Sequence, residues 1–357
     1  KTAYEISLGL VGSEMCIRDR DGERSIKEIM TSKNLITVSP NTSLKDAEQI
    51  LQKHKIEKLP VVDDSYKLVG LITYRDITKQ TVKPISNKDI YGRLRLAAAV
   101  GVTNDVIERT QALVDASVDA IVIDTAHAHS KRVAEILKEI KNSFSDLDVI
   151  VGNIATGKAA KFLADNGVDI VKVGIGPGSI CTTRIVTGVG IPQLSAVMDT
   201  FEVAKKYKIP VIADGGIKTS GDIAKAIAGG ASACMIGSLL AGTEESPGKL
   251  LSIKGKKYKS YRGMGSVGAM QKGSFDRYSQ EETKNAKKLV AEGVEGMVPY
   301  KGKTKDLVYQ LVGGLKSSMG YLGSKNIIKL RKKPKFVKIT KAGFYESMVH
   351  NIDRVLK

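Results

Sequence analysis

Six short apolar runs alternate with amphipathic stretches in the middle of the 357-residue chain, and this alternation constrains the fold more than any other feature. The runs are "RLAAAVG", "DAIVIDTAH", "DVIVGNIATG", "DIVKVGIGPG", "PVIADGGI" and "SACMIGSLLAG". Helix-like stretches such as "TNDVIERTQALVDAS" and "SGDIAKAIAGG" separate them. Continuous apolar strands that alternate with amphipathic helices are typical of parallel strands buried on both faces. The sequence therefore predicts an α/β fold on a parallel sheet.

Polar or glycine-rich residues follow five of these apolar runs: Asp124–Thr125, Asn153, Gly174–Gly178, Asp214–Gly216 and Gly237–Ser238. Function at the carboxyl ends of successive parallel strands is typical of a (β/α)8 TIM-type barrel, and glycine-rich turns after its last strands commonly bind phosphate. An open doubly wound sheet is the alternative, but its first-turn glycine fingerprint is missing. We expect a barrel that binds a phosphorylated ligand.

The stretch "GIGPGSICTTR" places Cys181 among glycines and hydroxyl groups, close to Arg184. A free cysteine is usually a small buried hydrophobe, and Cys234, in the apolar run "SACMIGS", fits that description. The polar surroundings of Cys181 favour a thiolate instead. We interpret Cys181 as a candidate nucleophile beside a bound ligand.

Composition excludes several classes of protein. Three cysteines cannot form a disulfide framework, and their scarcity fits a reducing compartment, so we expect a cytoplasmic protein. No apolar run reaches the roughly 20 residues that a membrane span needs. The net charge of +18 raises the possibility of nucleic-acid binding, but the lysines are mixed with acidic residues along helical stretches and no aromatic platform accompanies them. We do not expect a nucleic-acid partner.

The N-terminal part divides into a leader and a small module. Residues 1–20, including Cys16, lack the periodicity of a folded core and are expected to be a non-native or disordered leader. Residues 21–85 are expected to form a β-α-β-β-α unit, with a strand at 35–38 and two apolar strands, "LPVVDD" and "LVGLIT". This unit resembles a single CBS module.

Thr73 and Asp76 in this module have two interpretations. The spacing Thr-x-x-Asp is that of a helix-capping box. The resemblance to CBS modules would instead make the two residues contacts for an adenine nucleotide. Because only one module is present, we favour the cap.

Six motifs later in the chain occur in the order that identifies a family. They are "GIGPGSICTTRIVTGVGIPQ", "ADGGI", "MIGSLLAGTEESPG", "YRGMGSVGAMQKGSFDRY", "VAEGVEGMVPYKG" and "GGLKSSMGY". Together they resemble the inosine-5′-monophosphate (IMP) dehydrogenases, which oxidise IMP to xanthosine monophosphate (XMP) with NAD⁺ in guanine nucleotide biosynthesis. The resemblance implies that residues 86–357 form the catalytic barrel domain, with a mobile flap at about 255–305.

The resemblance also assigns residues to the reaction. It implies that Cys181 forms a covalent thioimidate with the purine and that Thr183, Arg277 and Tyr278 take part in its hydrolysis, with arginine as an unusual base. The substrate would be held by Ser179, Asp214, Gly216, Gly237, Ser238, Tyr261, Gly263, Met264, Gly265 and Glu292. Asp124 would contact the nicotinamide ribose, and Asn153 would lie near the reacting ring.

A potassium site is implied as well. By the same resemblance, backbone carbonyls of Gly176, Gly178 and Cys181 would bind the ion, together with Glu346–Met348 (Glu346, Ser347 and Met348) of a neighbouring subunit. Carbonyl oxygens are hard ligands that suit such a cation. A site shared between subunits implies a cyclic oligomer, by analogy a homotetramer.

The chain departs from the family pattern at its N-terminal side. IMP dehydrogenases begin with two strand–helix units of the barrel and carry two CBS modules, whereas this chain shows one module and six strands. We therefore expect an incomplete barrel. Two other functions remain open: GMP reductase, which we expect to lack both the CBS module and the "GSFDRY" flap, and a non-catalytic fragment that binds nucleotide without turnover.

Overall fold

The computed structural model describes residues 25–349 except positions 29, 83, 90, 91, 279, 281–284 and 333. The predicted leader, residues 1–20, lies outside the described residues. The chain divides into two compact units, Lys1–Arg95 and Leu96–Lys357. None of the helices in the described part of the chain is long and apolar enough to cross a membrane.

The smaller unit is a helix–hairpin–helix around a small apolar core. Its main elements are α3 (Leu44–His54), β1 (Lys58–Val62), β2 (Leu68–Thr73) and α4 (Tyr74–Val82). The two strands pair antiparallel, and Leu51 and Leu59 are fully buried between them and the helices. The predicted strand at 35–38 reduces to a single parallel bridge from Val38 to Val61, because only this short stretch reaches the hairpin edge.

Thr73 and Asp76 form the predicted cap of α4. The Asp76 carboxylate accepts hydrogen bonds from the Thr73 backbone N–H (3.1 Å) and hydroxyl (2.6 Å). In return, the Thr73 hydroxyl accepts from the Asp76 backbone N–H (3.3 Å). These reciprocal bonds satisfy amides that the first helical turn leaves without partners. The capping interpretation is confirmed.

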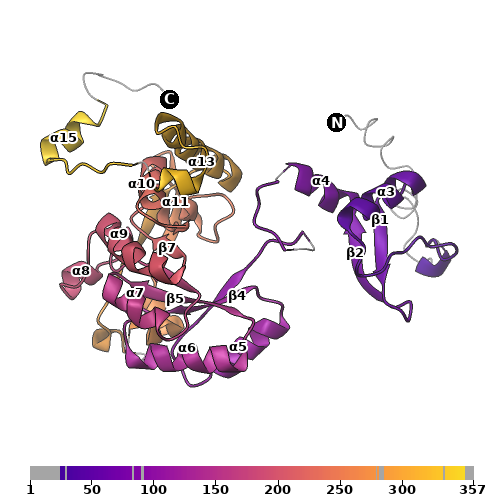
Figure 1. Ribbon diagram of the computed structural model, residues 1–357, viewed down its shortest axis with the longest axis horizontal. Helices are drawn as coiled ribbons and strands as arrows, with labels where there is room; N and C mark the ends of the chain where they lie inside the picture. The colour runs from indigo at the N-terminus through magenta and orange to yellow at the C-terminus, as the bar shows by residue number, and fades with distance from the viewer. Residues whose placement is uncertain are drawn as a thin grey trace. The chain divides into compact units, whose positions relative to one another are not determined.

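The larger unit is built on a parallel six-stranded sheet in the order β3-β4-β5-β6-β7-β8, so every strand pairs with its neighbour in sequence (Figure 1). The strands are β3 (Ala97–Val100), β4 (Ala120–Asp124), β5 (Asp148–Ile154), β6 (Ile170–Val173), β7 (Val211–Asp214) and β8 (Ala233–Met235). All six predicted strands are confirmed. Within the described residues β3 and β8 do not pair, so the sheet is an incomplete barrel of the expected TIM type.

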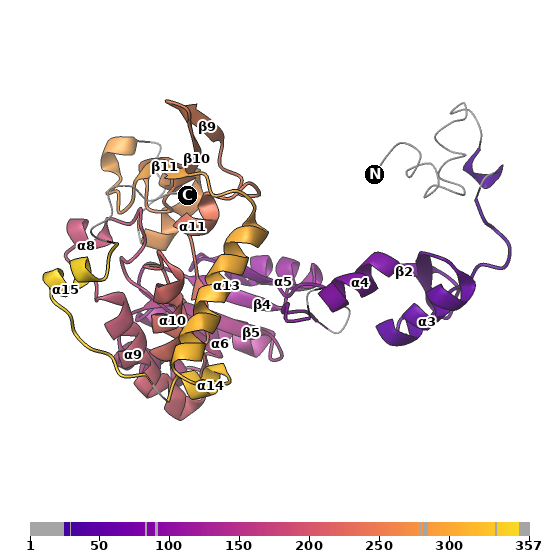
Figure 2. The same ribbon diagram turned by 90° about the horizontal axis from the view of Figure 1, so that it is seen from above.

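Helices cover the outer face of this sheet, and Figure 2 shows α13 lying along α10. They are α5 (Val106–Asp115), α6 (Lys131–Ser143), α7 (Gly157–Ala164), α9 (Gln193–Ala204), α10 (Ser220–Ala228), α13 (Thr304–Tyr321) and α14 (Ile327–Leu330). Their apolar faces share one core with alternate strand residues, including Val171 and Val173 of β6. Because side chains alternate along a strand, the residue between them, Lys172, points to the inner face.

The core contribution of α6 can be measured directly. Leu137 is fully buried in the core, so Leu137→Ala removes apolar contacts and leaves a cavity. We expect the free energy of unfolding to fall by about 2–5 kcal/mol, measured by urea denaturation. The exposed neighbour Lys138 provides the control, since Lys138→Ala should change it by less than about 0.5 kcal/mol.

After β8 the chain forms a separate antiparallel layer. Its strands, in the order β11-β10-β9, are β9 (Leu250–Ile253), β10 (Lys256–Arg262) and β11 (Glu295–Pro299). The segment between β10 and β11 carries the short helix η4 (Asp276–Tyr278). An isolated bridge joins Gly293 to Cys181. This layer therefore lies against the loop that follows β6.

Candidate active site

The loop that carries Cys181 is held in a tight conformation after β6. Gly176 has φ +78°, a left-handed value that glycine adopts without strain. The Arg184 side chain packs against it and donates hydrogen bonds to the carbonyls of Ile175 (3.1 Å) and Ile191 (2.5 Å). The backbone N–H of Cys181 donates to the Gly178 carbonyl (3.2 Å). The loop therefore fixes the position of the thiol.

The thiol begins a short chain of hydrogen bonds. Cys181 Sγ donates to Thr183 Oγ1 (3.1 Å), and Thr183 Oγ1 donates to Glu292 Oε2 (2.8 Å). The backbone reinforces this arrangement, because Thr182 N–H donates to the Glu292 carbonyl (2.8 Å). The geometry gives the thiol proton a path through a hydroxyl to a carboxylate.

Arg277 and Tyr278 face the same cavity from η4. Arg277 forms an ion pair with Asp124 at the end of β4, and its carbonyl accepts from the Ala126 N–H (3.0 Å). Burial lowers the pKa of the Arg277 guanidinium below its ordinary value. Burial raises the pKa of Tyr278, and the neighbouring Arg277 opposes this shift. An arginine with a lowered pKa loses its proton more readily, and only the neutral form can accept a proton as a base.

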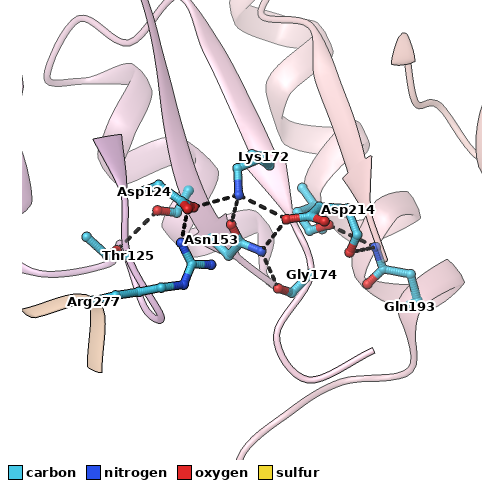
Figure 3. Close-up of polar contacts among 10 residues, drawn as sticks. Asp124, Thr125, Asn153, Lys172, Gly174, Gln193, Asp214 and Arg277 are labelled. Carbon is cyan, nitrogen blue, oxygen red and sulfur yellow. Dashed lines mark hydrogen bonds and ion pairs between the residues drawn. The ribbon is translucent and has the colours of Figure 1, made fainter. Parts of the chain in front are cut away.

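A polar cluster occupies the ends of β4 to β7 (Figure 3). Asn153 donates through Nδ2 to the Gly174 carbonyl (2.6 Å) and to Asp214 Oδ2 (2.9 Å). Lys172 contacts Asp124, Asn153 and Asp214 together. Asp124, Asn153 and Asp214 are among the residues predicted from the sequence, whereas Lys172 is not, although a lysine inside the apolar run "DIVKVG" is a signal that indicates it.

The residues predicted for the phosphate come from loops, from strand β10 and from the start of helix α11. A Cβ atom on Gly237 would lie 2.6 Å from the Tyr261 hydroxyl, so these two residues are adjacent. Burial, and next the charge of Asp214, raise the pKa of Tyr261. Gly216 has φ +76° in the turn after β7. Ser238 begins the short helix α11 (Ser238–Ala241), and Ser179 is exposed in the cysteine loop.

The residues predicted for the base converge on the cysteine loop from the other side. Gly263 N–H donates to the Val294 carbonyl (3.0 Å), and Glu292 N–H donates to the Gly265 carbonyl (2.9 Å). A Cβ atom on Gly265 would lie 2.8 Å from the Tyr278 ring. These contacts bring Gly263, Gly265 and Glu292 together beside Cys181.

A cavity of about 150 Å³ lies between these groups. Nine of the predicted residues line it: Asn153, Gly176, Gly178, Cys181, Thr183, Asp214, Met264, Arg277 and Tyr278. A second cavity of about 550 Å³ adjoins it and shares Met264 and Arg277, with Asp124 in its wall. The thiol thus opens onto this cavity, which lies next to a larger one.

The residues predicted for potassium lie in two segments. Gly176, Gly178 and Cys181 belong to the cysteine loop, whereas Glu346–Met348 stand exposed at the end of α15 (Lys341–Glu346). In the part of the chain that the structure describes, no residue of α15 lines the cavity. Among the described residues, no group of three or more histidine, cysteine, aspartate or glutamate side chains could hold a metal ion.

Comparison with known proteins identifies the family to which the chain belongs. The model of the IMP dehydrogenase / GMP reductase domain matches residues 7–350. The chain belongs to the IMP dehydrogenase / GMP reductase family. It is 56% identical to the inosine-5′-monophosphate dehydrogenase of Aquifex aeolicus, over 94% of this chain and 68% of that protein, and 55% identical to that of Bacillus subtilis, over 93% and 67%. The predicted family is confirmed.

The structural comparison includes the other branch of this family. The crystal structure of a GMP reductase variant from Trypanosoma brucei with guanosine 5′-monophosphate superposes with a TM-score of 0.85 and 40% identity. It covers 94% of this chain and 69% of that protein. Such coverage extends into the Lys1–Arg95 unit, so the small module does not separate this chain from GMP reductases as expected. The chain shares more sequence identity with the IMP dehydrogenases than with this GMP reductase. The active site must therefore distinguish between the two activities.

Proposed function

We propose that this chain oxidises IMP to XMP with NAD⁺ through a covalent intermediate on Cys181. The observation that carries the proposal is one cavity lined by Cys181, Thr183, Arg277 and Tyr278, with Glu292 hydrogen-bonded to Thr183. A nucleophile, a proton acceptor for it and a second base are what two successive steps at one carbon need.

In the first step the sulfur of Cys181 bonds to C2 of the purine, and the thiol proton passes through Thr183 to Glu292. NAD⁺ supplies the acceptor for the hydride that leaves C2. In this proposal the Asp214 carboxylate, at the end of β7, accepts hydrogen bonds from the ribose hydroxyls of IMP. Tyr261, Gly216, Gly237, Ser179 and Ser238 supply hydroxyl and amide donors of the kind that bind a phosphate.

In the second step water attacks C2, the carbon–sulfur bond breaks, and the sulfur regains a proton as XMP leaves. Arg277 is the base in this proposal, and its lowered pKa supports the role. Here Arg277 pairs with Asp124, the carboxylate that we assign to the nicotinamide ribose. Arg277 and the ribose of NAD⁺ would both bind the Asp124 carboxylate, so in this proposal Arg277 takes this position after the dinucleotide leaves.

The chain's residues also fit the predicted cofactors and assembly. Asp124 lines the larger cavity, where a carboxylate would accept hydrogen bonds from the ribose of NAD⁺. The carbonyls of Gly176, Gly178 and Cys181 are hard donors suited to potassium. We infer a cytoplasmic homotetramer in which the exposed segment Glu346–Met348 of one subunit completes the potassium site of the next.

The decisive experiment separates this function from its two alternatives. We expect the purified chain to form NADH from IMP and NAD⁺ in potassium buffer, with XMP as the product by chromatography. Consumption of NADPH with GMP and none of NAD⁺ with IMP would instead indicate GMP reductase, the activity named for the structural neighbour. Binding of IMP by calorimetry with neither reaction would identify a non-catalytic protein.

A further inference from the structure

Among the described residues, Lys172 is a buried charge to which the proposed mechanism gives no role. Lys172 lies in the middle of β6 (Ile170–Val173), and only 2% of its side chain is exposed. Burying an ammonium group costs several kcal/mol before its partners compensate, by an order-of-magnitude estimate. An apolar residue would fill this inner-face position at less cost, so its presence points to a specific task.

Its partners come from three different strands. Lys172 Nζ donates to Asp124 Oδ1 of β4 (2.8 Å), to Asn153 Oδ1 of β5, and to Asp214 Oδ2 of β7 (2.9 Å) (Figure 3). An ammonium group has three donors, and all three are used here. The amide of Asn153 closes the arrangement by donating to the same Asp214 oxygen (2.9 Å).

The charges of this cluster balance only with the lysine in place. Two carboxylates, Asp124 and Asp214, face two cations, Lys172 and Arg277. Arg277 contacts Asp124 from the flap side, through the other carboxylate oxygen, Oδ2. When Arg277 gives way to the dinucleotide, Lys172 still contacts both carboxylates.

We propose that Lys172 is a positioning residue that sets the two nucleotide sites relative to each other. One ammonium group holds the carboxylate assigned to the nicotinamide ribose, the carboxylate assigned to the IMP ribose, and the amide beside the reacting ring. Hydride transfer needs the two rings in register, and misplacement by about 1 Å can cost about 100-fold in rate. This inference rests on the proposed function.

The test compares Lys172→Met with Lys141→Met. Lys141 is the matched control, because it also pairs with a carboxylate, Asp169 (3.0 Å), and a backbone carbonyl, but lies outside the site. IMP affinity is measured by calorimetry, the KM for NAD⁺ and kcat by NADH formation, and folding by circular dichroism. We expect Lys172→Met to weaken IMP binding and raise the KM for NAD⁺, each by about tenfold or more, as lost charge-assisted bonds do. Lys141→Met should stay within about twofold of the unsubstituted chain.

A lysine that only stabilises the barrel would change neither constant in a folded variant. Folded Lys172→Met with unchanged constants, or equal losses in Lys141→Met, would overturn the proposal. If Lys172→Met does not fold, Lys172→Arg decides, since a planar guanidinium cannot reproduce three bonds from one nitrogen. Its IMP affinity should fall by about threefold or more, and constants equal to those of the unsubstituted chain would refute positioning.

The unsubstituted chain distinguishes the two levels of inference. If it binds and oxidises IMP while Lys172→Met behaves identically, only the role of Lys172 is wrong. If it neither binds nor oxidises IMP, the proposed function is wrong and the role of Lys172 falls with it.

Discussion

Replacing Cys181 with alanine should abolish NADH formation from IMP. The variant keeps the cavity but lacks the sulfur that bonds to C2, so neither the hydride step nor the hydrolysis can proceed by the proposed route. We expect kcat to fall by at least about 10⁴-fold, as for other enzymes that lose a nucleophile. Steady-state NADH formation measures the loss, and calorimetry should show that IMP still binds, because Asp214 and the phosphate loops are unchanged.

The second described cysteine provides the control. Burial raises the pKa of the Cys234 thiol to about 11, so at neutral pH it stays protonated and unreactive. Cys234→Ala should therefore keep the parent kcat, with only a small change in stability. Substantial activity in folded Cys181→Ala would remove the covalent mechanism and leave only the family assignment.

The sheet could be predicted from sequence because its signal is local. Each strand is a run of apolar residues with a polar or glycine-rich end, and residues such as Val149 and Val171 are buried whichever neighbours the strand receives. The order of the six strands then follows from short right-handed connections between neighbours. The prediction of a strand at 35–38 was wrong because this stretch has no local signal that fixes its pairing. Its pairing depends on the edge of the β1–β2 hairpin, where only Val38 forms a bridge.

The candidate site could be predicted only through resemblance. Thr183 and Glu292 are 109 residues apart, and nothing in either local sequence indicates their hydrogen bond. Lys172 could not be predicted because its role depends on the face of the sheet to which its side chain points. On the outer face the same lysine would lie among the core helices. Its role becomes visible only once the register sets it opposite Gly152, between the ends of β4 and β7.

Replacing Arg277 with alanine should separate the two halves of the reaction. Attack by Cys181 and hydride transfer do not use the guanidinium, whereas hydrolysis does. We therefore expect a rapid burst of about one NADH per active site, followed by turnover about 10²- to 10⁴-fold slower than in the parent, the range for loss of a general base. Rapid mixing measures the burst, and mass spectrometry of the quenched enzyme should show purine nucleotide attached to Cys181.

The pH dependence of the slow step gives a second check on Arg277. Because burial lowers its pKa, the deprotonated fraction grows as pH rises, so hydrolysis in the parent should accelerate toward alkaline pH. Arg277→Ala should lose this acceleration, whereas Arg132→Ala, on the exposed face of α6, should retain it. Slow turnover without a burst would instead show that Arg277 acts before hydrolysis, in the first half of the reaction. Its ion pair with Asp124 would then serve binding rather than hydrolysis.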